Sequence, residues 1–388
     1  MPQFFVTYRT AVHFAVRGKA SLGVTAILTT VAATFLSSMS KVSGYSYEAA
    51  ASVSASSTSA LSRARALVAP ECRLSSMGEF EGAEFFEENR KLLADAWGEY
   101  GLVHKEFAEA ERAKDLLHPS LMERIRNLRN QPEEKAEIQV KGVWEEVLPG
   151  VFASQLLSEE GLIKLREEID HLSKAGIPTR RPNGMNRFGL MFDKGGEFGG
   201  VPLLCEFLDG LVGEIVKPLA QTLFSDLVGR HEANDYYAFT VRYRPDEDTS
   251  LAEHRDASVV TLNMNIPSIV TKPDGTKGIA SEAEYSGSDL YFLIRGQGGV
   301  EEKKHLQFRP GMAIIHRGDL RHSALPIESG QRSNLIVWLH GEGGFVRIAP
   351  LDPVERTTAE ERWGGKEREG ESAKGAAGSE QRQTVTDS

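Results

Sequence analysis

Short runs of β-branched and aromatic residues follow one another from Tyr236 onward and are separated by Gly, Pro and Asp. The runs are YYAFTVRY, SVVTLNMNI, DLYFLI, KHLQFRP, GMAIIHR and NLIVWLH. This composition and spacing predict β-strands. The second run alternates between two sets of side chains, the apolar Val260, Leu262, Met264 and Ile266 and the set Val259, Thr261, Asn263 and Asn265. One set suits a core and the other a pocket, so the strands predict a sandwich or jelly roll.

The sequence before these strands predicts helices. Residues 79–134 are dense in Ala, Glu, Lys, Leu and Arg, which indicates helices with one apolar stripe that pack as a scaffold on the main domain. Ser158, followed by Glu159 and Glu160, suits a helix start, and apolar residues then recur at helical spacing. The stretch PLLCEFLDGLVGEIVKPLAQTLF predicts another helix against the sheet.

The two ends of the chain differ from this folded part. Residues 1–70 contain Glu48 as their only acid, and the apolar run Leu22–Leu36 follows three basic residues and precedes a Ser/Ala-rich stretch. A cleaved targeting segment fits this pattern, in a chain that enters a plastid, a mitochondrion or the secretory pathway. The apolar run is shorter than a comfortable membrane span, so an uncleaved membrane anchor is the alternative. Residues 351–388 are charged and Gly/Ser/Gln-rich, which predicts a disordered tail.

Length, net charge and cysteine content indicate the domain organisation and argue against two classes of binding site. The chain has 388 residues, and we expect a targeting segment at 1–70, a helical scaffold at 71–140, a catalytic domain at 141–350 and the tail. A net charge of -10 argues against a nucleic-acid partner. The two cysteines form no CxxC pair, so no thiolate zinc site is indicated.

The segment LAEHRDAS carries the candidate metal chemistry. His254 and Asp256 are two residues apart, and such residues share one face of an extended strand. A third ligand must come from a distant strand, for which HRGDLRHSALPI offers His316 and His322. Two His and one carboxylate form the facial triad of non-haem iron(II) oxygenases, which leaves positions for a 2-oxo acid and O2.

Arg332 offers a partner for the far carboxylate of such a 2-oxo acid. Its guanidinium can form two parallel hydrogen bonds to a carboxylate. It lies ten residues beyond His322, and this spacing favours His322 over His316 as the third ligand. A zinc hydrolase with the same three ligands is an alternative, which Arg332 disfavours.

Several segments together resemble the iron(II)/2-oxoglutarate-dependent dioxygenases, in the branch with prolyl and lysyl hydroxylases and the 2-oxoglutarate and iron-dependent oxygenase domain proteins. They are HRDASVVTLNMNI, SGSDLYF, FRPGMAIIHRGDLRHSALPIESGQRSNLIVWL and, more weakly, RPNGMNRFGL, within Val143 to Gly343. The resemblance implies an α+β fold whose core is a double-stranded β-helix, a jelly-roll variant, with flanking helices.

The resemblance also implies roles for individual residues. His254, Asp256 and His322 would bind Fe(2+), and Arg332 would bind 2-oxoglutarate. Tyr243 looks like a second donor to the same carboxylate, and an ordinary core tyrosine is the alternative. Thr261 and Asn263 share one side of their strand and are candidates to line the pocket. His316 is expected near the ligands without being one.

The expected reaction converts 2-oxoglutarate and O2 to succinate and CO2 and hydroxylates a C–H bond, with L-ascorbate (vitamin C) keeping the iron ferrous. Asp256 disfavours halogenation, because halogenating relatives lack that carboxylate. Prolyl and lysyl hydroxylases make a protein or peptide side chain the first expected substrate, with a small molecule as the alternative. A catalytically inactive, cupin-like binding protein is the alternative from another class.

Overall fold

The structure is a computed structural model that describes residues 59–67, 83–121, 123, 144–193, 199–224, 236–296, 299–340, 345–347 and 356–358. The chain divides into the compact units Met1–Thr58 and Ser59–Ser388, and every described residue belongs to the second. The apolar run Leu22–Leu36 therefore lies outside the described residues. Within the described part of the chain, no helix has the length and apolar character needed to cross a bilayer.

The helical elements precede the main strands. They are α3 (Ala60–Ala66), α4 (Ala83–Tyr100), η2 (Lys105–Ala108), η3 (Ala110–Leu116), α7 (Glu159–Ser173), α8 (Cys205–Leu211), η4 (Val212–Val216) and α9 (Lys217–Leu223). α4 buries Phe86, Leu93 and Trp97 on one stripe and ends where Gly101 takes a φ of 71°. Glycine at this position closes a helix without strain. The predicted helix at 79–134 is therefore correct for α4, whereas Lys105–Leu116 forms 3-10 turns.

The helix that we expected after Ser158 is present as α7. The hydroxyl of Ser158 accepts a hydrogen bond from the backbone N–H of Gly161 at 3.0 Å, which confirms the predicted N-cap. The apolar residues Leu162, Leu165 and Ile169 are buried on one side of the helix. Farther along the chain, the predicted helix in PLLCEFLDGLVGEIVKPLAQTLF is confirmed as the run α8, η4 and α9, in which η4 is a π turn.

Strands make up most of the remaining structure. They are β1 (Glu145–Leu148), β2 (Val151–Gln155), β3 (Met191–Phe192), β4 (Tyr236–Tyr243), β5 (Leu251–His254), β6 (Val260–Asn265), β7 (Ile269–Thr271), β8 (Lys277–Ile279), β9 (Tyr285–Gly287), β10 (Leu290–Arg295), β11 (Glu301–Leu306), β12 (Met312–Arg317), β13 (His322–Ala324), β14 (Ile327–Gly330), β15 (Arg332–Leu339), β16 (Phe345–Arg347) and β17 (Arg356–Thr358). All six predicted strands are among them.

Two antiparallel sheets form the core of the fold. The larger sheet has the order β1-β2-β12-β6-β15-β4-β3, and the smaller has the order β11-β10-β13-β5. The chain alternates between them, because β4, β6, β12 and β15 lie in the larger sheet and β5, β10 and β13 lie in the smaller. Such alternation winds two facing sheets into a jelly roll. The predicted α+β fold with a double-stranded β-helix and flanking helices is confirmed.

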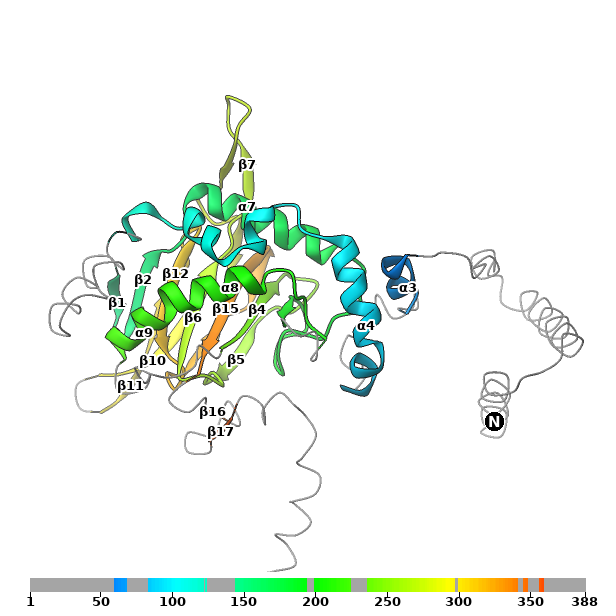
Figure 1. The fold of residues 1–388 in the computed structure, drawn as a ribbon. Coiled ribbons are helices and arrows are strands. Elements are labelled where there is room, and N and C mark those ends of the chain that lie inside the picture. Colours follow the sequence, from blue (N-terminus) through cyan, green and yellow to red (C-terminus); the bar gives the residue numbers. More distant parts are fainter. Residues whose placement is uncertain are drawn as a thin grey trace, which may run out of the picture. The chain divides into compact units, whose positions relative to one another are not determined.

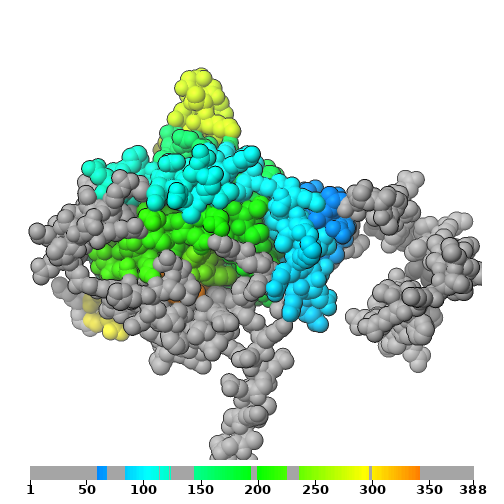
Figure 2. Space-filling view, viewed as in Figure 1, coloured from blue at the N-terminus to red at the C-terminus, as the bar shows by residue number. Residues whose placement is uncertain are grey.

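The two faces of the larger sheet bury different cores. Helices α7, α8 and α9 cover one face, where Leu262 and Met264 of β6 join the buried residues of the helices (Figure 1). Residues of η2 and η3, coloured cyan in Figure 2, pack against the green residues of α8. The other face packs Phe239 and Ile336 against Phe292 of the smaller sheet. The alternation predicted for β6 therefore separates a helix-facing core from the space between the sheets.

Several elements differ from the sequence-based expectation. The hairpin β1–β2 precedes α7, so strands occur earlier than we predicted. α3 lies inside the segment 1–70 and packs on α4, where Glu99 accepts hydrogen bonds from the backbone N–H groups of Ala60 and Leu61. β17 lies inside the predicted tail 351–388 and pairs with β16. Short strands and helices of this kind depend on partners elsewhere in the chain, which local composition does not reveal.

The long connection PSIVTKPDGTKGIASEAEYSG contains the hairpin β7–β8. It projects from the sheets beside α7 (Figure 1). Lys272 pairs with Glu159 at 2.9 Å, and Lys277 pairs with Glu167, so both contacts tie the hairpin to α7. The hairpin is therefore attached to the helical side of the larger sheet, while the candidate pocket lies between the sheets.

Candidate metal and anion site

His254, Asp256 and His322 converge at one end of the space between the sheets. His254 is the last residue of β5, His322 is the first of β13, and the two lie opposite each other in the strand pairing. Asp256 follows β5, so it lies in the turn after the strand and not on the strand as we expected. One ligand atom from each of the three residues lies within 4.8 Å of the others. Neighbouring strands thus bring a cluster of metal-ligand spacing together.

Both histidines present the same ring nitrogen to the cluster. The Nδ1–H of His254 donates to the carbonyl of Ala252 at 2.8 Å, and the Nδ1–H of His322 donates to the carbonyl of Leu320 at 2.9 Å. Each Nε2 then faces Oδ1 of Asp256, at 3.4 Å from His254 and 3.8 Å from His322. A backbone bond at Nδ1 fixes the neutral tautomer whose Nε2 lone pair binds a metal.

Asp256 is held by a short chain of hydroxyl groups. The hydroxyl of Thr261 donates to Oδ2 of Asp256 at 2.6 Å, and the hydroxyl of Ser258 lies 2.8 Å from that of Thr261. Since Thr261 uses its hydrogen on Asp256, Ser258 is the donor to Thr261. This bond occupies Oδ2 and leaves Oδ1 facing the two imidazoles. The carboxylate is thereby oriented to offer one oxygen to a metal.

The two histidines of the cluster differ in their electrostatics. Burial opposes charge on His254, but the hydrogen bond and charge of Asp256 raise its pKa above the usual value. Burial also opposes ionisation of Asp256, yet the adjacent His322 and His254 lower its pKa below the usual value. Burial lowers the pKa of His322 to about 3, against the opposing charge of Asp256. The carboxylate is therefore ionised and the imidazole of His322 is neutral near pH 7, which are the protonation states of metal ligands.

The other end of the pocket holds a buried cation. Arg332 opens β15 and is 2% exposed. Its Nε donates to the hydroxyl of Ser288 at 2.9 Å, and its guanidinium stacks on the ring of Tyr243 at 4.6 Å. Its Nη2 is buried and has no hydrogen-bond partner among the described residues. Burial lowers the pKa of Arg332, but a guanidinium still keeps its charge. A buried donor without a partner is costly, so this end suits an anionic ligand.

Tyr243 lies beside Arg332 and connects the pocket to a loop. It is the strand partner of Arg332 and is 2% exposed. Its hydroxyl oxygen accepts a hydrogen bond from the amide of Asn186 at 3.1 Å. Asn186 belongs to the pocket loop, which we define as residues 182–190. The tyrosine is thus part of a polar chain and not an isolated core side chain.

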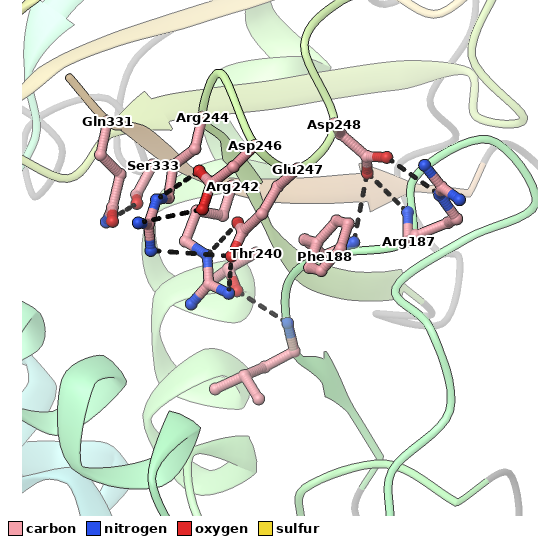
Figure 3. Close-up of polar contacts among 11 residues, drawn as sticks. Arg187, Phe188, Thr240, Arg242, Arg244, Asp246, Glu247, Asp248, Gln331 and Ser333 are labelled. Atoms are coloured by element: carbon pink, nitrogen blue, oxygen red, sulfur yellow. Dashed lines mark hydrogen bonds and ion pairs between the residues drawn. The ribbon is translucent and has the colours of Figure 1, made fainter. Parts of the chain in front are cut away.

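The pocket loop is fastened to the turn after β4. The carboxylate of Asp248 accepts hydrogen bonds from the backbone N–H groups of Arg187 at 2.6 Å and Phe188 at 3.2 Å (Figure 3). The hydroxyl of Thr240 accepts from the N–H of Leu190 at 2.9 Å. These bonds reach the loop from two sites on and after β4, so the strand that carries Tyr243 also holds the loop.

Asn263 adds a further polar group to the pocket. Its Oδ1 accepts a hydrogen bond from Nδ2 of Asn334 at 2.6 Å, and Asn334 is fully buried. The carbonyl of Asn263 is therefore occupied within the protein. Its amide hydrogens remain for a ligand in the pocket that Asn263 lines.

One pocket contains all seven residues that the sequence singled out as site candidates, which are Tyr243, His254, Asp256, Thr261, Asn263, His322 and Arg332. Its remaining lining is largely apolar, with Phe239, Leu251, Ala324 and Trp338 among the residues. A largely apolar pocket with a few convergent polar groups is the usual form of a ligand site.

His316 lies close to the cluster without joining it. Its side chain is fully buried, its ring lies 5.1 Å from that of His322, and its Nδ1 bonds the carbonyl of Arg317 at 2.9 Å. The group of residues at metal-ligand spacing contains His322 and not His316. Outside this cluster, Nε2 of His104 lies 2.7 Å from Glu167 of α7, a partner that spacing along the sequence does not reveal.

We call the part of the pocket at His254, Asp256 and His322 the metal end, and the part at Arg332 the anion end. The sequence analysis did not predict four polar residues around the anion end, which are Asn183, Asn186, Ser288 and Asn334. Ser288 combines a φ of 58° with complete burial, and such backbone strain often marks a functional position. The segment RPNGMNRFGL, which resembles the family more weakly, contains Asn183 and Asn186, so it was the part of the sequence that could have pointed to these two residues.

Comparison with known proteins supports the resemblance noted from the sequence. Residues 98–229 match the OGFOD2-like domain. The 2-oxoglutarate and iron-dependent oxygenase domain-containing protein ICU11 of Arabidopsis thaliana is 30% identical over 215 residues, which cover 53% of this chain and 48% of that protein. Procollagen-lysine,2-oxoglutarate 5-dioxygenase 1 of Mus musculus is 25% identical over 195 residues, which cover 47% of this chain and 23% of that protein. The resemblance to 2-oxoglutarate and iron-dependent oxygenase domain proteins is confirmed.

The chain spans about half the length of the ICU11 protein that it matches. Among solved structures, a Pseudomonas putida prolyl-4-hydroxylase is similar with a TM-score of 0.35 and 15% identity, over 54% of this chain and 98% of that one. The order of the strands in the two sheets defines the fold of this chain independently.

Proposed function

We propose that this chain is an Fe(II)- and 2-oxoglutarate-dependent dioxygenase. Its pocket would hold iron at His254, Asp256 and His322 and the distal carboxylate of 2-oxoglutarate at Arg332. The observation that carries the proposal is the combination of these two ends in one pocket: three residues at metal-ligand spacing at one end, and at the other a buried arginine whose Nη2 has no hydrogen-bond partner among the described residues.

The metal end fits ferrous iron through its donor set. Two neutral imidazoles and one carboxylate suit a divalent first-row metal and leave open positions on it. Bound iron would supply the binding and activation of O2. The chain contributes the orientation of its ligands, since backbone carbonyls fix both rings and Thr261 holds one oxygen of Asp256.

The anion end favours a ligand with a second carboxylate, because a carboxylate neutralises the charge of Arg332 and a water molecule does not. Nη2 of Arg332 needs an acceptor, and Tyr243 and Asn263 bring hydrogen-bonding groups to the same pocket. A carboxylate can accept charge-assisted hydrogen bonds from these groups and neutralise the buried charge. A zinc hydrolase has no evident need for this arrangement.

The substrate is proposed to be a side chain of a protein or peptide, in which the enzyme hydroxylates a C–H bond. Succinate and CO2 would be released from 2-oxoglutarate in the same reaction. The support is the resemblance to prolyl and lysyl hydroxylases and the similarity to a procollagen-lysine 5-dioxygenase. The apolar residues Leu251, Ala324 and Trp338 line the pocket and would receive an aliphatic group. L-Ascorbate is proposed as the reductant that keeps the iron ferrous. We also propose that residues 1–70 contain a cleaved segment that targets the chain to a plastid, a mitochondrion or the secretory pathway.

The test is succinate release from 2-oxoglutarate by the purified full chain with Fe(II), ascorbate and O2. We expect slow release without a substrate, loss of release in Asp256→Ala and Arg332→Ala, and faster release when prolyl or lysyl peptides are added. Stimulation by small molecules alone would favour the small-molecule alternative. Binding of iron and 2-oxoglutarate without any succinate release, across peptide and small-molecule libraries, would favour an inactive binding protein. Tightly held zinc that does not exchange with iron would contradict the oxygenase.

A further inference from the structure

The pocket loop carries a chain of amides that ends on Tyr243. Asn183 is 6% exposed and Asn186 is 1% exposed. The chain runs from the backbone of the loop through Asn183 and Asn186 to the tyrosine hydroxyl. What it implies rests on the proposed function, because it concerns how the pocket binds the distal carboxylate of a 2-oxo acid.

The backbone fixes the orientation of the first amide. Oδ1 of Asn183 accepts hydrogen bonds from the N–H groups of Met185 and Asn186, both at 2.7 Å. Backbone N–H groups are donors only, so the atom facing them must be the carbonyl oxygen. The Nδ2 of Asn183 is therefore directed to Oδ1 of Asn186, at 3.1 Å.

The second amide inherits its orientation from the first. Because Oδ1 of Asn186 accepts from Asn183, its Nδ2 must face Tyr243, where it donates to the hydroxyl oxygen at 3.1 Å. Burial raises the pKa of Tyr243, so the phenol keeps its hydrogen. The described residues offer no acceptor for that hydrogen, and Tyr243 lines the pocket. The hydrogen is thus available to a ligand.

We propose that Asn183 and Asn186 are positioning residues that set the hydroxyl of Tyr243 as a donor to the distal carboxylate of the 2-oxo acid. Their amides accept and donate in one fixed direction from the backbone to the pocket. Tyr243 then supplies a neutral donor beside the cationic Arg332, and the loop, which itself lines the pocket, becomes part of co-substrate recognition.

The attachment of the loop supports this role. Asp248 holds the N–H groups of Arg187 and Phe188, directly after Asn186 (Figure 3). The hydroxyl of Tyr237 donates to the carbonyl of Pro182 at 2.8 Å, directly before Asn183. Both ends of the amide chain are therefore fastened to β4 or to the turn that follows it, which keeps the amides in register with Tyr243.

The test compares two acids that differ only in the distal carboxylate. Affinities of 2-oxoglutarate and 2-oxopentanoate are measured by anaerobic calorimetry on the iron(II)-loaded full chain. Asn183→Asp keeps the oxygen that accepts from the backbone but cannot donate to Asn186. We expect Asn186 to rotate, to present its carbonyl to Tyr243, and so to draw the hydroxyl hydrogen away from the ligand. Asn186→Leu removes the second amide at similar volume.

We expect both variants to bind 2-oxoglutarate roughly 10-fold more weakly, the loss expected for one hydrogen bond to a charged group. Affinity for 2-oxopentanoate should change by less than about 2-fold, well under the value of one such bond. Gly184→Ala is the matched control in the same loop, because nothing lies within 4 Å of its added Cβ. It should bind both acids as the wild type does, and thermal melting identifies any variant that fails to fold.

A double-mutant cycle with Tyr243→Phe separates positioning from direct contact. If the amides act through the hydroxyl, Asn183→Asp and Asn186→Leu should have no further effect in the Tyr243→Phe background. Additive losses, equal losses for both acids, or unchanged affinity for 2-oxoglutarate in folded variants would each overturn the inference. A wild type that does not prefer 2-oxoglutarate over 2-oxopentanoate would overturn the proposed function as well, which distinguishes the two failures.

Discussion

The two ends of the pocket differ in the partners that the protein provides for a buried charge. At the metal end, Asp256 accepts a hydrogen bond from Thr261 and, against burial, raises the pKa of His254, so its charge has partners within the protein. At the anion end, Arg332 contacts the hydroxyl of Ser288 and two aromatic rings, feels the charge of Asp289 only from a distance, and leaves Nη2 without a partner among the described residues. Both groups are almost fully buried.

This difference indicates that the metal end suits a cation and that the anion end suits a negatively charged group of a ligand. The metal end offers three ligand atoms within 4.8 Å of one another, and a metal cation there would take the place of the proton that Asp256 favours on His254. The anion end offers a charge that burial makes costly until an anion arrives. Under the proposed function, a 2-oxo acid with a distal carboxylate would meet both needs at once, because its keto acid group would bind the metal and its far carboxylate would pair with the arginine.

Removing a ligand at the metal end should have the largest effect. His322→Ala takes away one of three protein donors, so we expect metal affinity to fall by at least about 100-fold, the upper range for loss of a supporting partner alone. Metal content after anaerobic loading measures this. His316→Ala is the matched control, a buried histidine 5.1 Å away by ring centroids, and should retain the metal. The reverse pattern would show that the ligand is His316.

Removing the charge at the anion end should separate binding from stability. Arg332→Met keeps much of the side-chain volume, and we expect it to weaken 2-oxoglutarate binding by about 100-fold through loss of a charge-assisted pair. Without 2-oxoglutarate, the free energy of unfolding should stay equal or rise by about 1–4 kcal/mol, because an unpaired buried charge disappears. Denaturant unfolding with and without 2-oxoglutarate checks both. Strong destabilisation of the ligand-free variant would contradict the comparison.

Loosening the carboxylate at the metal end should have an intermediate effect. Thr261→Val removes the hydroxyl that donates to Asp256 and keeps the β-branched shape of the residue on β6. We expect metal affinity to fall roughly 10-fold, as for other residues that orient a ligand, while affinity for 2-oxopentanoate relative to 2-oxoglutarate stays constant. Thr261→Ser should restore the metal affinity. A Thr261→Val protein with wild-type metal affinity would exclude this role.

Releasing the pocket loop should have the smallest effect. Asp248→Ala leaves the N–H groups of Arg187 and Phe188 without their acceptor, although water can replace it where the loop is exposed. We expect the KM for 2-oxoglutarate to rise about 3-fold with kcat little changed, because a single replaceable hydrogen-bond group contributes modestly. Steady-state succinate release measures both constants. An unchanged KM would separate the loop from the anion end.

Local pattern was sufficient to predict the parts of the site that strands carry. The alternation around Thr261 and Asn263 separates core from pocket, and His322 and Arg332 each open a strand, β13 and β15, with the short β14 between them. Even here Asp256 lies after β5 and not on it, so the pairing of two residues at i and i+2 gave the correct neighbours for an incomplete reason.

The remaining features depend on contacts between distant parts of the chain. Asn186 meets Tyr243 across 57 positions, and Ser288 meets Arg332 across 44. Neither pair has a periodic signature, because a loop residue is placed by the anchors of its loop and not by its own neighbours in sequence. The partnership of His104 with Glu167 was hidden for the same reason.

If the pocket couples O2 to the oxidation of 2-oxoglutarate, one oxygen atom of O2 must enter succinate. The full chain with Fe(II) and ascorbate is supplied with ¹⁸O2 and 2-oxoglutarate, and succinate is analysed by mass spectrometry. We expect one ¹⁸O atom in the new carboxylate of each succinate, and no succinate from Asp256→Ala. Unlabelled succinate, or labelled succinate that persists in that variant, would contradict this coupling.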